Sequence, residues 1–420
     1  MPLLPLTALL VSVLAAAVLA RTGASARLAD HPLLTFAVGA AAGFALDLTP
    51  APPPPPEAVR EAARLGLAFL AFTAAQQCRP SRLGAVCQPA LRLAVIALPL
   101  VAVGAAAAIF ALLPGVGVRP AALIGVGLVL GGGVFDEKAA MNAPLSAAVK
   151  RTVRLDTAAG LVVGIPLAVL VEVAIVAPNP NVPLWSYPGF GLFAGAAVGG
   201  AIGLLGARLL RPKDAAVPRA PLLTFAAAFA ACRLLGFDPV MGGVACGLLY
   251  SEEAGLLGPV RSRLVGAGLR WVAPLTAFAA GLLLAPVAMG ANLLMVLAAC
   301  AILLALAPLS RGAALGAADL PDEARAFLCR FGGAPGVGAM LFFLSLLASP
   351  ALAADSEALA LGVLCVAGGL VLGRIASGPL VTRQVRAAAR HFFQGPAPRR
   401  NDRQSAGHSF QGSQPEALVV

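Results

Sequence analysis

Apolar residues in this chain form long runs separated by short polar segments, a pattern typical of helices that cross a membrane. A helix needs about 20 apolar residues to cross ~30 Å of hydrocarbon. That length predicts about thirteen spans, near residues 3–20, 32–48, 62–77, 90–113, 120–149, 155–177, 188–210, 220–235, 238–250, 268–287, 289–309, 328–349 and 356–381. The chain is therefore predicted to be an all-α polytopic membrane protein.

Composition and charge agree with this class. Of the 420 residues, 59% are hydrophobic and only 12% are charged, and the net charge is +11. Lys and Arg fall mainly in alternate loops, as the positive-inside rule describes, so the charge does not require a nucleic-acid partner. We expect an integral protein of a lipid bilayer, such as the bacterial inner (plasma) membrane, with its N-terminus outside and its C-terminus cytoplasmic. Arg60 and Arg64 belong to a predicted outer loop, beside Glu57 and Glu61.

The chain is predicted to hold one membrane domain and a tail. No segment between the spans is long enough to fold alone, so residues 1–385 are assigned to a single transmembrane domain. From about Gln394 the sequence is polar and rich in Pro, Gly, Ser and Arg, which cannot bury a core. Residues 386–420 are therefore expected to form a cytoplasmic, disordered tail.

Residues able to hold a metal or a cofactor are scattered along the sequence. The seven cysteines form no CxxC pair, and the three histidines do not cluster. The sequence contains no GxGD, HExxH or GxSxG signature with its partners. We expect no metal centre, no cofactor and no enzymatic activity.

The run from Gly131 to Lys138 is the most informative segment, because it places charge and flexibility inside an apolar span. Three glycines are followed by Asp136, Glu137 and Lys138. A charge at membrane depth costs at least ~2.5 kcal/mol, so such residues usually face a protein cavity and mark a path for ions or protons. Adjacent glycines each cost roughly 1 kcal/mol of helix stability relative to alanine, which favours a broken helix here.

A second interruption is predicted in the other half of the chain, from Trp271 to Phe278 around Pro274 and followed by Gly281. Paired broken helices are typical of inverted-repeat secondary transporters, whose ion site lies where the two breaks cross. The predicted fold is therefore an inverted-repeat bundle with two crossing broken helices.

Six collinear stretches resemble the cation:proton antiporter superfamily, in its sodium/proton exchanger branch. The resemblance extends roughly from residue 65 to residue 381, and the stretches lie at residues 72–83, 128–136, 240–249, 271–282, 330–338 and 373–380. The stretch from Leu128 to Asp136 resembles the broken helix that carries a Thr-Asp-Pro signature. The resemblance implies thirteen helices, a homodimer in which a core bundle moves against an interface bundle, and transport of a monovalent cation and H+.

The chain also departs from this family at its ion site. Phe135 and Glu137 stand where the signature has Thr and Pro, around Asp136. The next helix should carry an Asn-Asp or Asp-Asp pair before a glycine, but Ala158 and Ala159 occupy those positions. The nearest acidic substitute is Asp156, about one helical turn earlier.

A second pair of family residues has changed together. The upstream Glu of the family becomes Arg154, and the Arg of its Gly-Pro-Arg-Gly signature becomes Pro335. Losing only one partner would leave an uncompensated buried charge, which costs several kcal/mol, so the loss of both is the tolerable outcome.

Asp136 and Asp156 are the candidate ion- and proton-binding residues, each with a plainer interpretation beside it. Asp136 could instead end a helix at the cytoplasmic surface, and Asp156 could be an interface charge paired with Lys150 or Arg151. Glu172, isolated in its own apolar span, is either a neutral packing group or a group near the outer vestibule.

Four supporting residues complete the prediction. Glu137 and Lys138 could form an internal ion pair in place of a bound sodium, and Arg154 lies near Asp156 in sequence. The hydroxyl of Thr276 could serve a cation or freed backbone groups, although hydroxyls in membrane helices more often serve packing and hydrogen bonding.

Two functions follow from these observations. The first is a secondary antiporter that exchanges Na+ or K+ for H+, with Asp136 carrying the ion and Asp156 assisting. The alternative is a diverged, non-transporting member of the same fold that acts as a membrane sensor or scaffold. The charge retained at the break favours the first, and the missing carboxylate pair favours the second.

Overall fold

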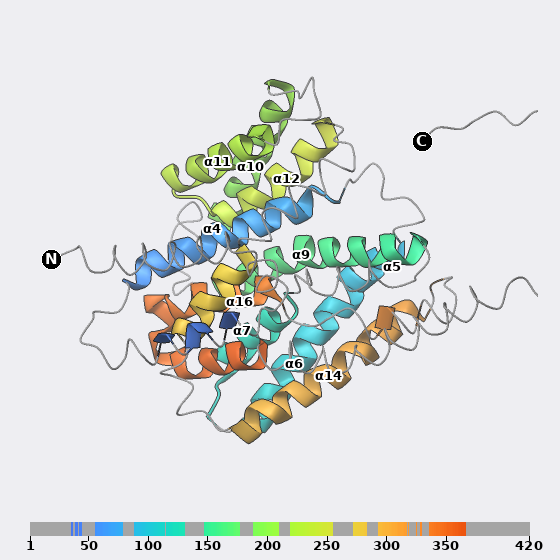
Figure 1. Ribbon diagram of the computed structural model, residues 1–420, viewed down its shortest axis with the longest axis vertical. Coiled ribbons are helices and arrows are strands. Elements are labelled where there is room, and N and C mark those ends of the chain that lie inside the picture. Colours follow the sequence, from blue (N-terminus) through green and yellow to red (C-terminus); the bar gives the residue numbers. More distant parts are fainter. Residues whose placement is uncertain are drawn as a thin grey trace, which may run out of the picture.

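The computed structural model describes most of the membrane domain (Figure 1). The described residues are 35–43 without 37 and 41, 55–78, 88–113, 115–130, 147–176, 188–209, 219–254, 272–283, 293–316, 318, 325, 328, 329 and 336–366. All regular elements in these ranges are helices, which confirms the all-α prediction. The predicted run from Gly131 to Lys138 and the tail lie outside the described residues.

Three continuous helices in the described part are long and apolar enough to cross a membrane. They are Gln88–Leu112, Leu155–Val176 and Gly189–Leu209. A fourth span is possible from Val337–Leu347 and Pro350–Val366, two helices that meet at a bend of 106°. These helices agree with the predicted integral membrane protein, and the total of thirteen spans stays a prediction.

The first of these spans contains a local change of helix type. It consists of α5 (Gln88–Arg92), a π-helical turn η3 (Leu93–Ala97) and α6 (Leu98–Leu112). Pro99 lies two residues after the π turn and has no N–H to donate to the preceding turn. Such a proline favours a shift in the hydrogen-bond register, and π turns inside α-helices are frequent at functional sites.

Helix α12 (Pro239–Ala254) lies between α10 (Pro188–Leu209) and α4 (Pro56–Ala75), and glycines set both contacts. A Cβ atom added to Gly199 of α10 would lie 2.1 Å from the Gly242 carbonyl oxygen of α12. On the other face of α12, a Cβ atom on Gly247 would lie 2.4 Å from the Phe72 carbonyl oxygen of α4. Only glycine allows backbones to approach this closely, as in the small-xxx-small contacts of membrane helices.

The remaining helices extend from both sides of α4. Helix α11 (Arg219–Leu234) joins α10 and α12 on one side, while α9 (Ala147–Val176), α7 (Val118–Leu128), α6 and α14 (Leu293–Leu315) lie on the other (Figure 1). Helix α16 (Val337–Leu347) packs against both α4 and α7, and the 3-10 turn η5 (Pro350–Asp355) follows it.

The predicted interruption at Trp271–Phe278 is not observed in the residues described there. Val272–Leu283 form one short helix, and Pro274 lies near the N-terminal end of this stretch. A proline near a helix start does not break the helix, since the first N–H groups have no intrahelical partner. Backbone contact is again close: a Cβ atom on Gly281 would lie 2.2 Å from the Phe36 carbonyl oxygen.

Candidate functional site

The end of α7 meets the start of α16 at the point where the Gly131 run begins. The carbonyl oxygen of Leu130 accepts hydrogen bonds from the backbone N–H groups of Gly336, at 3.2 Å, and Ala339, at 3.1 Å. Leu130 is fully buried. The described end of the first interrupted helix therefore lies against the N-terminus of α16, whose dipole places partial positive charge there.

The sequence did not predict this contact. The structure brings Leu130 to Gly336, directly after a run rich in Gly and Pro. The crossing expected near Pro274 involves the run from Gly131 to Lys138, which lies outside the described residues, so it stays a prediction. Gly164, near the middle of the Leu155–Val176 span, lies beside the same place, because a Cβ atom on it would lie 3.1 Å from a Leu130 methyl group. The contact between α7 and α16 thus lies at the middle of a membrane span.

The predicted site residues at the break, Asp136, Glu137 and Lys138, lie outside the described residues. The backbone of Arg154 belongs to α9, but its side chain is also outside them. The Thr276 hydroxyl donates a hydrogen bond to the Val272 carbonyl oxygen at 2.6 Å, within its own helix. This is the hydrogen-bonding role that the sequence favoured for Thr276.

Asp156 is buried and forms an ion pair with Arg311 of α14. The side chains of Asp156 and Arg311 are 11% and 8% exposed, and the Arg311 Nε–H group also donates to the Leu328 carbonyl oxygen at 2.8 Å. The charge pairing considered for Asp156 is therefore present, but its partner is 155 residues away in the sequence. A cation or proton that bound Asp156 would have to compete with this guanidinium group.

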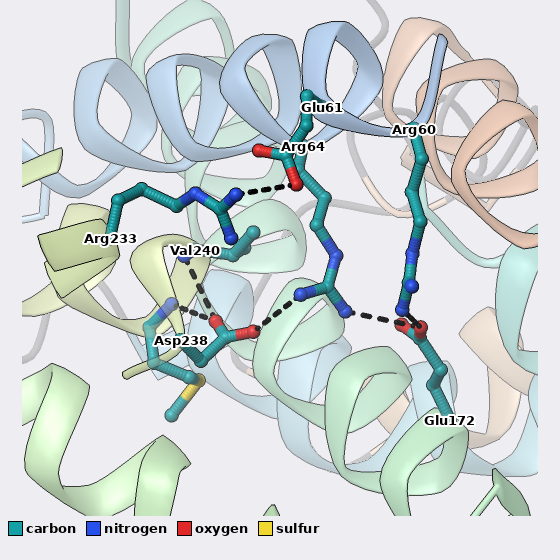
Figure 2. A network of polar contacts seen from close by, with 8 residues as sticks. Arg60, Glu61, Arg64, Glu172, Arg233, Asp238 and Val240 are labelled. Carbon is teal, nitrogen blue, oxygen red and sulfur yellow. Dashed lines mark hydrogen bonds and ion pairs between the residues drawn. The ribbon is translucent and has the colours of Figure 1, made fainter. Parts of the chain in front are cut away.

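Glu172 lies at the other end of the Leu155–Val176 span from Asp156 and is held by two arginines of α4 (Figure 2). Its Oε1 atom lies 3.2 Å from Arg64 Nη2 and 3.8 Å from Arg60 Nη2. Sixteen residues separate the two carboxylates of α9, which corresponds to roughly 24 Å along a helix. The structure therefore places one buried carboxylate–arginine pair near each end of the span.

Arg64 also binds a second carboxylate, Asp238, at the start of α12 (Figure 2). Arg64 Nη1 lies 3.5 Å from Asp238 Oδ2, while Asp238 Oδ1 accepts hydrogen bonds from the N–H groups of Val240 and Met241, both at 2.9 Å. Asp238 is thus the N-cap of α12, a role in which its carboxylate satisfies two free N–H groups. The side chains of Arg64, Glu172 and Asp238 are 17%, 6% and 8% exposed.

Around these buried charges lies a more exposed pair, Glu61 and Arg233, with 2.8 Å between Glu61 Oε1 and Arg233 Nη2 (Figure 2). The cluster of Arg60, Glu61, Arg64, Glu172, Arg233 and Asp238, here called the α4 charge cluster, contains equal numbers of positive and negative groups. Buried charges need such pairing, because an isolated ion in a low-dielectric interior is costly.

The roles of Arg64, Asp238 and Arg311 were not predicted from the sequence. The charge pattern predicts an outer loop at Arg64, whereas α4 begins at Pro56 and presents Arg60 and Arg64 on one face, four residues apart. The available signal was Glu172 itself, since a lone carboxylate inside an apolar span calls for a basic partner. The sequence does not show which arginine is the partner, because Arg64 and Glu172 are 108 positions apart in the chain.

No family model matches this chain, and no curated protein matches it either. Two solved structures of the sodium proton antiporter MjNhaP1 from Methanocaldococcus jannaschii are similar over almost the whole chain. The structure at pH 8 has a TM-score of 0.63 and 14% identity, covering 91% of this chain and 98% of that chain. The electron-microscopy structure has a TM-score of 0.64 and 15% identity, covering 95% and 100%. The resemblance of the sequence to the cation:proton antiporters thus holds at the level of architecture, and the chain has the all-α membrane fold of a sodium proton antiporter.

Proposed function

We propose that the protein is a secondary active antiporter that exchanges a monovalent cation, Na+ or K+, for H+. The observation that carries this proposal is the fold, which aligns with MjNhaP1 over 95% of this chain and all of that one. Function resides in sites rather than folds, so the proposal also needs a group that can bind a cation or a proton in turn.

Asp136 is the proposed ion-binding group. It follows Leu130 by six residues, and Leu130 lies two residues beyond the end of α7, where its carbonyl oxygen contacts the N-terminus of α16. Transporters of this architecture bind ions where interrupted helices meet, because helix ends leave backbone groups free to contact the ion. Glu137, Lys138 and Arg154 are the proposed supporting charges, and we propose that the protein works as a homodimer.

Asp156 is proposed to assist through its pair with Arg311. A carboxylate bound to a guanidinium group is released only when a cation, a proton or a movement of α14 weakens the pair. Asp156 would therefore act as a second, conditional carboxylate rather than as a permanently open ion ligand.

Flux in proteoliposomes tests the exchange proposal. An imposed pH gradient is followed with an internal pH dye while Na+, K+ or Li+ is added outside. We expect cation-dependent dissipation in the wild type, its loss in Asp136→Asn, and normal exchange in Glu253→Gln, which removes a carboxylate from an exposed pair with Arg208. Equal activity of Asp136→Asn and wild type would exclude Asp136 as the ion carrier.

A non-transporting membrane sensor or scaffold is the second candidate, and one observation favours it. Among the described residues, every buried carboxylate is bound by an arginine, namely Asp156, Glu172 and Asp238. Ala158 and Ala159 moreover occupy the positions of the expected carboxylate pair. No response of folded wild-type protein to any of the three cations would support this alternative.

A further inference from the structure

Helices α4, α10 and α12 form one tightly packed unit, here called the glycine block. Gly243 and Gly247 of α12 contact the backbone of α4, since added Cβ atoms would lie 2.6 and 2.4 Å from carbonyl oxygens there. Gly195, Gly199 and Gly203 of α10 contact the α12 backbone in the same way, at 2.3, 2.1 and 2.6 Å. Backbone-to-backbone contact leaves no flexible side chains between these helices, so they are expected to move together.

At its two glycines, helix α9 makes no backbone contact of this kind with the described part of the chain. A Cβ atom added to Gly164 would meet there only side-chain atoms of Leu98 and Leu130, at 3.2 and 3.1 Å. No atom of a described residue lies within 4 Å of a Cβ atom added to Gly160. Near the C-terminal end of α9, charge pairs join it to the glycine block through Glu172 and the two arginines of α4.

Arg64 stands between a carboxylate of its own block and one of α9. Asp238 is fixed to the block, because its Oδ1 atom caps α12 and its N–H group donates to the Gly191 carbonyl oxygen of α10 at 3.1 Å. If α9 moved away, Arg64 would keep Asp238 as a partner, whereas Glu172 would lose both arginines. Asp238 is thus the partner that remains for Arg64. Without it, separation would leave the Arg64 charge buried and unpaired, which is strongly unfavourable.

We propose that the Glu172–Arg64 pair is a releasable clasp between α9 and the glycine block, and that Asp238 is the partner that retains Arg64 when the clasp opens. For an exchanger this clasp would control access to the bundle from one end of α9, and this use of the clasp rests on the proposed function. The clasp itself is a property of the fold and can be measured without transport.

Hydrogen–deuterium exchange of the full-length protein in lipid nanodiscs tests the clasp. The readout is the exchange rate of residues 165–176, the part of α9 around Glu172, with residues 147–156 as an internal reference. Glu172→Gln removes the charge that spans the contact, and Asp238→Asn removes the replacement partner while keeping an oxygen that can cap α12. Glu61→Gln is the matched control, because it removes one negative charge from the same cluster at a side chain that is 42% exposed.

We expect Glu172→Gln to raise the exchange rate of residues 165–176 about tenfold, which corresponds to ~1.4 kcal/mol of easier opening. Asp238→Asn should leave that rate equal to or below the wild-type rate, because Arg64 then depends on Glu172 alone. A purely structural charge cluster predicts the opposite for Asp238→Asn, namely faster exchange.

Faster exchange of residues 165–176 in Asp238→Asn, or identical rates in Glu172→Gln and Glu61→Gln, would overturn the proposal. If Glu172→Gln does not give a folded protein, Asp238→Asn decides alone by the same criterion. The flux assay separates the two proposals: a normal clasp response without exchange refutes only the antiporter, and active exchange without a clasp response refutes only the clasp.

Discussion

Removing either partner of the Asp156–Arg311 pair should destabilise the protein, and by unequal amounts. Breaking a buried ion pair by removing one partner typically costs 3–5 kcal/mol, because the other charge is left without compensation. In Asp156→Asn the Arg311 guanidinium group keeps its hydrogen bond to the Leu328 carbonyl oxygen, so we expect about 3 kcal/mol, the lower end of that range. Arg311→Met also removes the hydrogen bond to that carbonyl oxygen, which adds roughly 1 kcal/mol.

The double variant Asp156→Asn/Arg311→Met should recover most of this loss. It leaves no unpaired buried charge, and replacing both members of a buried pair is often neutral or stabilising. The single variants are expected to cost about 3 and about 4 kcal/mol, so a double variant that costs about 2 kcal/mol would show a coupling energy of roughly 5 kcal/mol, above the ~0.5–3 kcal/mol usual for contacting residues.

Steric trapping of the reconstituted protein would measure these free energies of unfolding without the need for a transport assay. Glu253→Gln is the control, because its pair with Arg208 is 3.1 Å long but exposed, with 65% of the arginine side chain accessible. Exposed pairs contribute ~0–1 kcal/mol. Equal costs of Asp156→Asn and Glu253→Gln, or additive effects in the double variant, would refute the idea that burial makes the Asp156 pair important.

Two further predictions concern helix packing and a buried amide. Gly199→Ala should lower stability by about 1–3 kcal/mol in thermal unfolding, because its Cβ atom would overlap the Gly242 carbonyl oxygen. Gly191→Ala, whose Cβ atom would have no atom of a described residue within 4 Å, should change little. Equal melting temperatures for these two variants would contradict the close packing of α10 on α12. Gln76 is fully buried, and its side-chain amide has no hydrogen-bond partner among the described residues. Gln76→Met should therefore keep or raise stability, and a loss beyond ~2 kcal/mol would mean that the amide is satisfied in the membrane-embedded protein.

The long apolar helices could be predicted from the sequence to within a few residues. The spans expected at 155–177 and 188–210 correspond to Leu155–Val176 and Gly189–Leu209, because a continuous apolar run of this length has few other stable forms in a bilayer. Shorter elements were less well placed. The interruption expected around Pro274 is absent from Val272–Leu283, which form one helix, because a proline breaks a helix only where its missing N–H and its ring interfere. The contact between the end of α7 and α16 was not predicted.

The candidate site could be predicted only in part, because a carboxylate in an apolar span shows that a partner is needed but not which residue supplies it. Asp156 and Glu172 stand out in the sequence for this reason. Their partners, Arg311 and Arg64, lie 155 and 108 residues away and look like ordinary charges at span ends. Both pairings depend on how α9 packs against α14 and α4.

The sequence by itself determined that the chain is an all-α membrane protein and where its long spans lie, since local hydrophobicity and the thickness of the bilayer decide these features. The tertiary structure alone decided which charges meet, which helices share backbone contact through glycine, and where α7 meets α16. Those features depend on contacts between segments far apart in the chain. The role of a glycine or of a lone charge in a membrane helix depends on which helix it contacts.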